Sequence, residues 1–150
     1  MFKNLFFGGA GGGSRLADLG LLILRVYTGV LFVLMHGWVK FQNPSQIMQG
    51  TASMGMPAPK LMGGMAIFAE LVGGALLAVG LFTRPAAFLI ASTMTVAFFK
   101  AHEGSLQKGE LAATYLAVAV CLMFTGAGRF AIDPLLRGRG GRKKIQVDRS

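Results

Sequence analysis

Two charged residues lie inside long apolar segments of this chain, where a charge is unfavourable unless it has a partner. Arg25 lies nine residues into the apolar run that begins at Leu16, and Glu70 lies nine residues beyond Leu61, where a second run begins. At 1.5 Å per residue, both reach a depth of about 14 Å from opposite faces of a bilayer. We therefore expect an Arg25–Glu70 ion pair near the midplane, which either lines a functional site or only fixes the helix register.

Three further titratable side chains follow these helical faces. With about 100° of rotation per residue, His36 returns to within about 20° of the face that carries Arg25, and Lys40 lies about 60° from it. A third run carries the stripe Ser92, Thr95, Phe99 and His102. The predicted orientation indicates an outward-facing cationic pocket whose outer mouth carries His36, Lys40, Lys100, His102 and Glu103. Interfacial snorkelling is the alternative for Lys40 and Lys100, whereas a histidine can accept or donate a proton near neutral pH. The predicted intramembrane polar site consists of Arg25, Glu70, His36, Lys40 and His102.

A fourth run also has a stripe of small and polar residues, namely Glu110, Thr114, Ala117, Cys121 and Thr125. Together the stripes predict helices that turn polar faces toward a shared interior. The alternative is that each hydroxyl or thiol bonds to the preceding backbone turn of its own helix. The single cysteine excludes an internal disulfide and a cysteine pair, and the histidine spacing predicts no metal site. The methionines in the loop after the first run and in the second run indicate flexible packing, with copper binding by thioethers as the alternative.

The composition shows which elements must position these groups. Of the 150 residues, 53% are hydrophobic and 14% are charged, which is too apolar for an ordinary soluble domain. Apolar runs of about 20 residues can cross a bilayer, and four are expected, at residues 16–35, 61–82, 85–101 and 109–128. The sequence therefore predicts an all-α, integral-membrane, antiparallel four-helix bundle.

Three regions follow from these runs. We expect a glycine-rich lead-in at residues 1–15, a membrane domain at 16–136 and a basic tail at 137–150. Between the first two runs, the sequence MGMPAP predicts a turn. Small residues in the runs predict close helix contacts, either within one bundle or between copies in a homo-oligomer.

The distribution of Lys and Arg predicts the orientation. Ten of these residues lie on the side of both termini and the Arg84 turn, and four lie on the other side: Lys40, Lys60, Lys100 and Lys108. By the positive-inside rule, both termini are cytoplasmic. We interpret the basic tail as a contact for anionic lipid headgroups and not for nucleic acid, because no nucleic-acid-binding motif accompanies it.

Several motifs together resemble a known family. The segments LRVYTGVLFVLMHGWVKF, AELVGGALLAVGLFTRPAA, AHEG and FTGAGRFAIDPLL are similar, in order and spacing, to those of the DoxX family of small bacterial inner-membrane proteins with four helices. The resemblance covers about residues 16–136. It departs at Ala127, where the family often has proline between two glycines. Besides the five polar-site residues, the resemblance assigns structural motif positions to Gly37, Gly73, Arg84, Gly128, Arg129 and Asp133.

The resemblance implies a role in membrane redox assemblies, since the family is named after a subunit of thiosulfate:quinone oxidoreductase. Arg129 and Asp133, four residues apart just beyond the last run, are expected to form an ion pair. The chain has no haem motif, flavin fingerprint or cysteine pair, so we expect no intrinsic cofactor and no catalysis without a redox-enzyme partner.

Three functions remain open from the residues. The first is a subunit whose polar site holds a quinone head or a sulfur-containing anion. The second is transport of a small solute or protons, motivated by the same intramembrane charges. The third is a structural or assembly factor whose charges only fix helix register.

Overall fold

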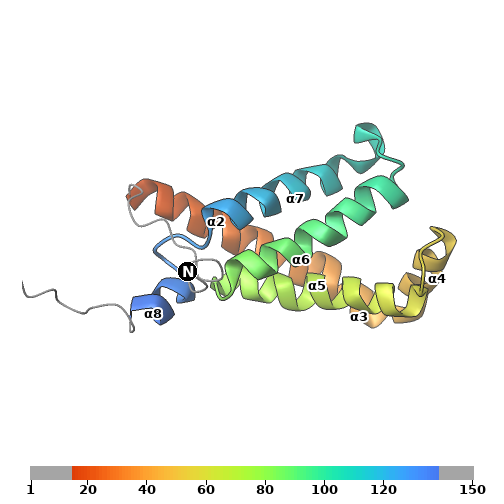
Figure 1. Cartoon of the computed structure of the whole chain (residues 1–150), viewed down its shortest axis with the longest axis horizontal. Helices are drawn as coiled ribbons and strands as arrows, with labels where there is room; N and C mark the ends of the chain where they lie inside the picture. Colours follow the sequence, from red (N-terminus) through yellow and green to blue (C-terminus); the bar gives the residue numbers. More distant parts are fainter. Residues whose placement is uncertain (1–14, 139–150) are drawn as a thin grey trace, which may run out of the picture.

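The computed structural model describes residues 15–138, which form helices and connecting turns without a strand (Figure 1). The first long helix consists of α2 (Arg15–Leu31), a π-helical turn η1 (Phe32–Gly37) and α3 (Trp38–Gln42). It is followed by α4 (Pro44–Ser53), α5 (Pro59–Val79), α6 (Thr83–Val96) and the π-helical turn η2 (Ala97–Ala101). The chain then forms α7 (Leu106–Thr125) and α8 (Ile132–Gly138). The all-α prediction is confirmed, whereas residues 1–14 and 139–150 of the expected lead-in and tail lie outside the described part.

Three helices are long and apolar enough to cross a membrane: Arg15–Gln42, Pro59–Val79 and Leu106–Thr125. The first has 28 residues and continues beyond residue 35, where the first run was expected to end. Residues 85–101 lie in the continuous α6–η2 helix, which is not one of these three candidates. Together with the apolar composition, these helices identify a membrane protein.

Proline and glycine mark several helix boundaries. Pro44 and Pro59 occupy the first turns of α4 and α5. Proline is tolerated there because the N–H groups of a first turn make no hydrogen bond within the helix. Gly80 ends α5 with a φ of 71°. The expected turn at MGMPAP is confirmed, because Gly55 and Ala58 both have left-handed backbone angles there.

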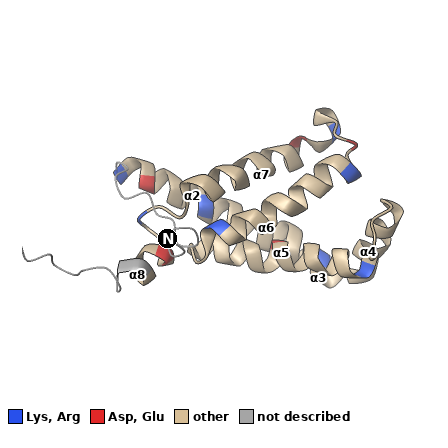
Figure 2. Ribbon diagram, in the orientation of Figure 1, with Lys and Arg blue, Asp and Glu red and all other residues tan. Residues whose placement is uncertain are grey.

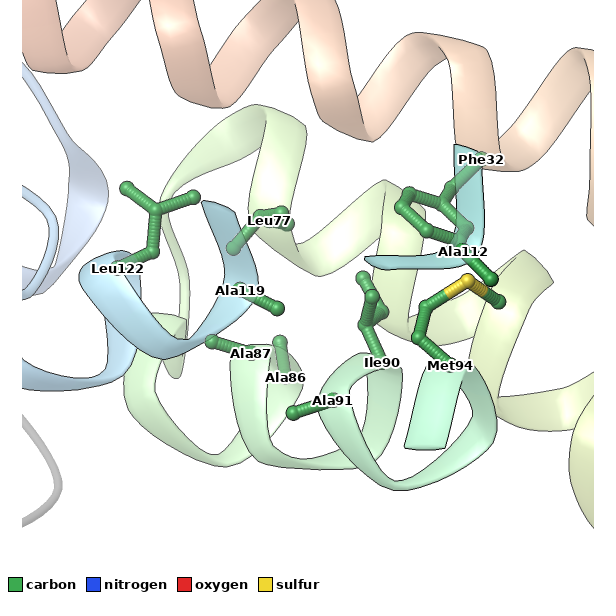
Figure 3. Close-up of a cluster of buried hydrophobic side chains, with 10 residues drawn as sticks. All are labelled: Phe32, Leu77, Ala86, Ala87, Ile90, Ala91, Met94, Ala112, Ala119 and Leu122. Atoms are coloured by element: carbon green, nitrogen blue, oxygen red, sulfur yellow. The ribbon is translucent and has the colours of Figure 1, made fainter. Parts of the chain in front are cut away.

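The core lies where α6 packs between α5 and α7 (Figure 3). Its buried residues are Phe32, Leu77, Ala86, Ala87, Ile90, Ala91, Met94, Ala112, Ala119 and Leu122. Half of these are alanines, whose small side chains let the helix backbones approach closely.

Glycines set the contact between the first long helix and α5. A Cβ added to Gly29 would lie 2.6 Å from the carbonyl oxygen of Gly74, and one added to Gly37 would lie 2.7 Å from the Cα of Leu71. Gly73, which was expected to be a motif position, has room for a side chain: a Cβ added there would lie 3.6 Å from the carbonyl oxygen of Ala86, an ordinary contact distance. These contacts fix which residues of the two antiparallel helices lie side by side.

Candidate functional site

A cavity of about 750 Å³ lies between two helical hairpins, one formed by the first long helix and α5 and the other by α6–η2 and α7. It lies at the end that carries α4 and the η2–α7 turn. On one side it is lined by η1, α3, α4 and α5, and on the other by α6, η2 and α7. Most of its wall is apolar, and a small number of polar side chains converge on it. This volume and character are typical of small-molecule sites.

An ion pair lies in the wall of this cavity. Lys40 Nζ on α3 donates a hydrogen bond to Glu70 Oε1 on α5, at 2.5 Å. The side chain of Glu70 is 1% exposed and that of Lys40 is 28% exposed. Glu70 Oε2 is buried and has no hydrogen-bond partner within the described residues. The carboxylate therefore keeps one free acceptor for a donor brought by a ligand.

His36 lies beside this pair in an aromatic contact between the hairpins. Its ring centroid lies 5.3 Å from that of Phe32 and 5.6 Å from that of Tyr115 on α7. The Phe32 and Tyr115 rings are also in contact, at 4.9 Å. His36 and Tyr115 both line the cavity, so these rings bridge the two halves of its wall.

His102 reaches the cavity from the opposite side. Its backbone N–H donates to the carbonyl of Ala97 at 3.1 Å, which closes the end of η2. A Cβ at Gly109 would lie 2.9 Å from the Cβ of His102, so this glycine gives the histidine its room beside α7. The structure thus brings four predicted site residues to one cavity: His36, Lys40, Glu70 and His102.

Arg25 does not join them, and the predicted Arg25–Glu70 ion pair is wrong. Glu70 lies at the level of Gly37 on the first long helix. Gly37 is twelve residues beyond Arg25, so Glu70 and Arg25 are separated by about 18 Å along the helix axis. Equal depth was inferred by starting both helices at their first apolar residue, but glycine contacts set a different register. The π-helical turn η1 lies between Arg25 and His36, so the rotation of about 100° per residue that the prediction assumed does not hold from Phe32 to Gly37.

Arg25 instead belongs to a second polar cluster near the α5–α6 turn. The residue is 1% exposed, and its Nη2 donates to the carbonyl of Phe130 at 2.5 Å. Its guanidinium fills the space that a side chain at Gly80 would need. Its Nε and Nη1 have no hydrogen-bond partner among residues 15–138.

The remaining charged motif positions also lie at this end. The predicted Arg129–Asp133 pair is wrong, because Arg129 contacts Asp18: its backbone N–H donates to Asp18 Oδ1 at 3.1 Å. Asp133 accepts hydrogen bonds from the N–H groups of Phe82 and Thr83 at 2.7 and 3.0 Å. It therefore caps the start of α6. Arg84 donates to the carbonyl of Phe124 at 3.2 Å, and Gly128 lies against Asp18 with a φ of 72°.

The predicted polar stripe on α7 faces outward, so four polar faces do not meet in one interior. Its exposed residues are Glu110, Thr114, Ala117, Cys121 and Thr125. Thr125 bonds to the carbonyl of Cys121, and Ser92 and Thr95 likewise bond to the preceding turns of α6. The alternative interpretation, in which each hydroxyl bonds to the preceding backbone turn of its own helix, is thus confirmed at these positions.

Several lining residues were not predicted. Tyr115 gave no sequence signal, because a single aromatic residue in an apolar run is ordinary core. The methionines in the cavity wall are Met35, Met54, Met56, Met62, Met65 and Met94. Their clustering in sequence was visible, but only the fold directs six of the nine methionines to one cavity. No group of three His, Cys, Asp or Glu residues within 15–138 has a metal-binding arrangement.

A family model described as DoxX matches residues 20–103. The chain belongs to the DoxX family. A Haemophilus influenzae protein described as "Uncharacterized protein" is 36% identical over 122 residues, covering 75% of this chain and 87% of that protein. A Bacillus subtilis protein described as "Putative oxidoreductase CatD" is 33% identical over 121 residues, covering 79% of this chain and 88% of that protein. No solved structure gives a significant match.

The matched range of this DoxX protein contains the four cavity residues and also Arg25. It ends before Tyr115 and Asp133, which complete the cavity wall and the polar cluster, respectively.

Proposed function

We propose that this DoxX protein is a multi-pass protein of the bacterial cytoplasmic (inner) membrane that binds a quinone head group as a subunit of a membrane redox complex. In the proposed topology, α2–α3, α5, α6–η2 and α7 form a four-helix bundle across the bilayer. Both termini are cytoplasmic, and the cavity opens toward the outer face.

The placement of charges supports this orientation. Most charged residues lie toward the two ends of the long helices, and one acidic position lies in the middle of α5 (Figure 2). Arg15 begins α2, Arg84 lies in the first turn of α6, and Arg129 lies between α7 and α8, all at the end where the chain enters and leaves the bundle. The lysines of the cavity end are Lys40, Lys60, Lys100 and Lys108. Arginine at the terminal side and the basic tail together favour a cytoplasmic location for that side.

The observation that carries the quinone proposal is the unpartnered Oε2 of Glu70 in a largely apolar cavity. A quinol hydroxyl can donate a hydrogen bond to this oxygen. The ammonium of Lys40 has further N–H groups, which can donate to a quinone carbonyl. The apolar wall suits a flat ring, and methionine side chains adapt readily to its shape.

A partner must carry the electrons in this proposal. The sequence has one cysteine and no haem or flavin motif, so the DoxX chain supplies a binding site and its partner supplies the redox group. The description of the Bacillus subtilis relative as "Putative oxidoreductase CatD" supports a link to redox chemistry.

A binding measurement tests the site. The protein is placed in lipid nanodiscs and titrated calorimetrically with a short-chain quinol. Glu70→Gln removes the charged acceptor, and we expect it to weaken binding by about tenfold to a hundredfold, as for a hydrogen bond to a charged group. Glu103→Gln is the matched control, because it removes one member of the exposed Lys108–Glu103 pair at 2.8 Å. Wild-type affinity in both Glu70→Gln and Lys40→Met would reject the quinone site.

A second experiment tests the subunit role. The tagged protein is extracted in mild detergent at its native expression level, and co-purifying proteins and lipids are identified by mass spectrometry. We expect a recurring redox enzyme or bound quinone. A homo-oligomer that carries neither would contradict the proposed role.

A further inference from the structure

Three apolar side chains belong both to the cavity wall and to the outer surface. Met35 on η1, Val39 on α3 and Leu111 on α7 all line the cavity. Their exposed fractions are 63%, 50% and 58%, respectively. The cavity is therefore open sideways, between the first long helix and α7, along a rim of apolar groups.

The packing of α7 explains this opening. α7 packs along α6, and it reaches η1 through the ring contacts of Tyr115 with Phe32 and His36. Leu111 lies one helical turn from Tyr115, toward the end that carries α4. In that direction α7 and the α2–α3 helix diverge (Figure 1). The ring contacts thus close the slot on the side away from α4, and Met35, Val39 and Leu111 form its walls.

The depth of this slot determines what surrounds it. Met35 lies seven residues before Gln42, where the first long helix ends, and Leu111 lies five residues after Leu106, where α7 begins. At 1.5 Å per residue, the slot lies about 7–10 Å below the helix ends. For helices that span the bilayer, this level faces lipid acyl chains and not water.

We propose that the ligand of this cavity is a membrane-resident amphiphile that enters sideways from the lipid through the slot between η1–α3 and α7. Its polar head contacts Glu70 and Lys40, and its apolar tail lies between Met35 and Leu111 and continues into the bilayer. This inference rests on the proposed quinone site and adds the ligand class and the route of entry. It disfavours a tailless, water-soluble anion as the ligand.

A second edge of the cavity is the competing route of entry. Met65 on α5 and Ser92 on α6 also line the cavity and are exposed on its other side. The hydroxyl of Ser92 is already bonded to the carbonyl of Phe88 at 2.8 Å. A tryptophan at either edge places the same indole ring at a surface position. The Met35–Leu111 slot has the larger exposed apolar rim, so we assign the tail to it.

The test compares one quinone ring with a long isoprenoid tail and the same ring without a tail, both titrated into the protein in nanodiscs. We expect Leu111→Trp to weaken binding of the tailed quinone by about tenfold or more, while the tailless ring keeps its wild-type affinity within about twofold. Ser92→Trp, at the second edge, is expected to weaken the tailed quinone less than Leu111→Trp does. Ala117→Trp, at an exposed position of α7 outside the cavity wall, is the control and is expected to leave both affinities unchanged. Met35→Trp narrows the same slot from the opposite side and replaces Leu111→Trp if that variant does not fold.

The other outcomes overturn the inference in distinguishable ways. If the wild type gains nothing from the tail, or Leu111→Trp and Met35→Trp leave tailed binding intact, the lateral slot is wrong and the quinone site stands. If Ser92→Trp blocks the tailed quinone instead, the assigned slot is wrong. If the wild type binds neither quinone, the proposed function itself fails.

Discussion

The ammonium of Lys40 and the carboxylate of Glu70 meet at 2.5 Å, the shortest ion pair among residues 15–138. The pair joins α3 to α5 at the wall of an apolar cavity. Glu70 is nearly inaccessible, whereas Lys40 retains access to the cavity. In the described part of the chain, Lys40 is the residue that forms an ion pair with this carboxylate.

Removing the lysine alone should destabilise the protein. Lys40→Met leaves a buried carboxylate without a counter-charge, and we expect it to lower the free energy of unfolding by about 3 kcal/mol. The double variant Lys40→Met/Glu70→Met should recover most of that loss but should not bind quinone. Thermal unfolding in detergent and calorimetric titration measure the two effects. Wild-type binding by the double variant would show that the pair is only structural.

The close contact of the first long helix with α5 should depend on glycine. In Gly37→Ala, the added methyl group collides with the α5 backbone at Leu71, so we expect destabilisation by about 1–3 kcal/mol. Gly64→Ala is the control in α5, because nothing lies within 4 Å of a Cβ there. Its thermal midpoint should be unchanged or slightly raised. Equal midpoints for the two variants would contradict the helix register described above.

The cap on α6 should contribute measurably to stability. Asp133→Ala removes the acceptor for the N–H groups of Phe82 and Thr83, and we expect a loss of about 1–2 kcal/mol. Asp133→Asn keeps one acceptor oxygen and should lose less. Thermal unfolding in detergent compares the two variants. A larger loss in Asp133→Asn than in Asp133→Ala would argue against capping as the role of this side chain.

The proposed orientation can be tested with cysteine labelling. Cys121 is first replaced by Ser, and Arg15→Cys or Lys108→Cys is then introduced at an exposed helix end. A membrane-impermeant thiol reagent added to intact cells or spheroplasts should label Lys108→Cys. It should label Arg15→Cys only after the membrane is permeabilised. The reverse pattern would place the termini on the outer side.

Much of the fold was predictable from local sequence. Apolar runs predicted the three candidate spans, and prolines and glycines predicted several helix ends. The helix α4 was not predicted, because Pro44–Ser53 has no charged residue or strong apolar periodicity. It is stabilised instead by packing on α5, where Gly63 approaches Met48 and Thr51.

The candidate site was predicted only in part. The residues Glu70, Lys40, His36 and His102 were identified because charge and histidine are rare in apolar helices. The pairing of Glu70 with Lys40 was not predicted, because a run of hydrophobic residues does not reveal where a helix begins in the membrane. It also does not reveal where a π-helical turn changes the rotation of the helix.

The sequence by itself determined that this is an all-helical membrane protein of the DoxX family, because length, apolarity and short motifs are local properties of the chain. Only the tertiary structure decided that Glu70 pairs with Lys40 while Arg25 packs over Gly80 at the α5–α6 turn. That choice depends on where glycines allow two backbones to touch. The physical reason is that steric contact between helices sets their register, and register decides which charges meet.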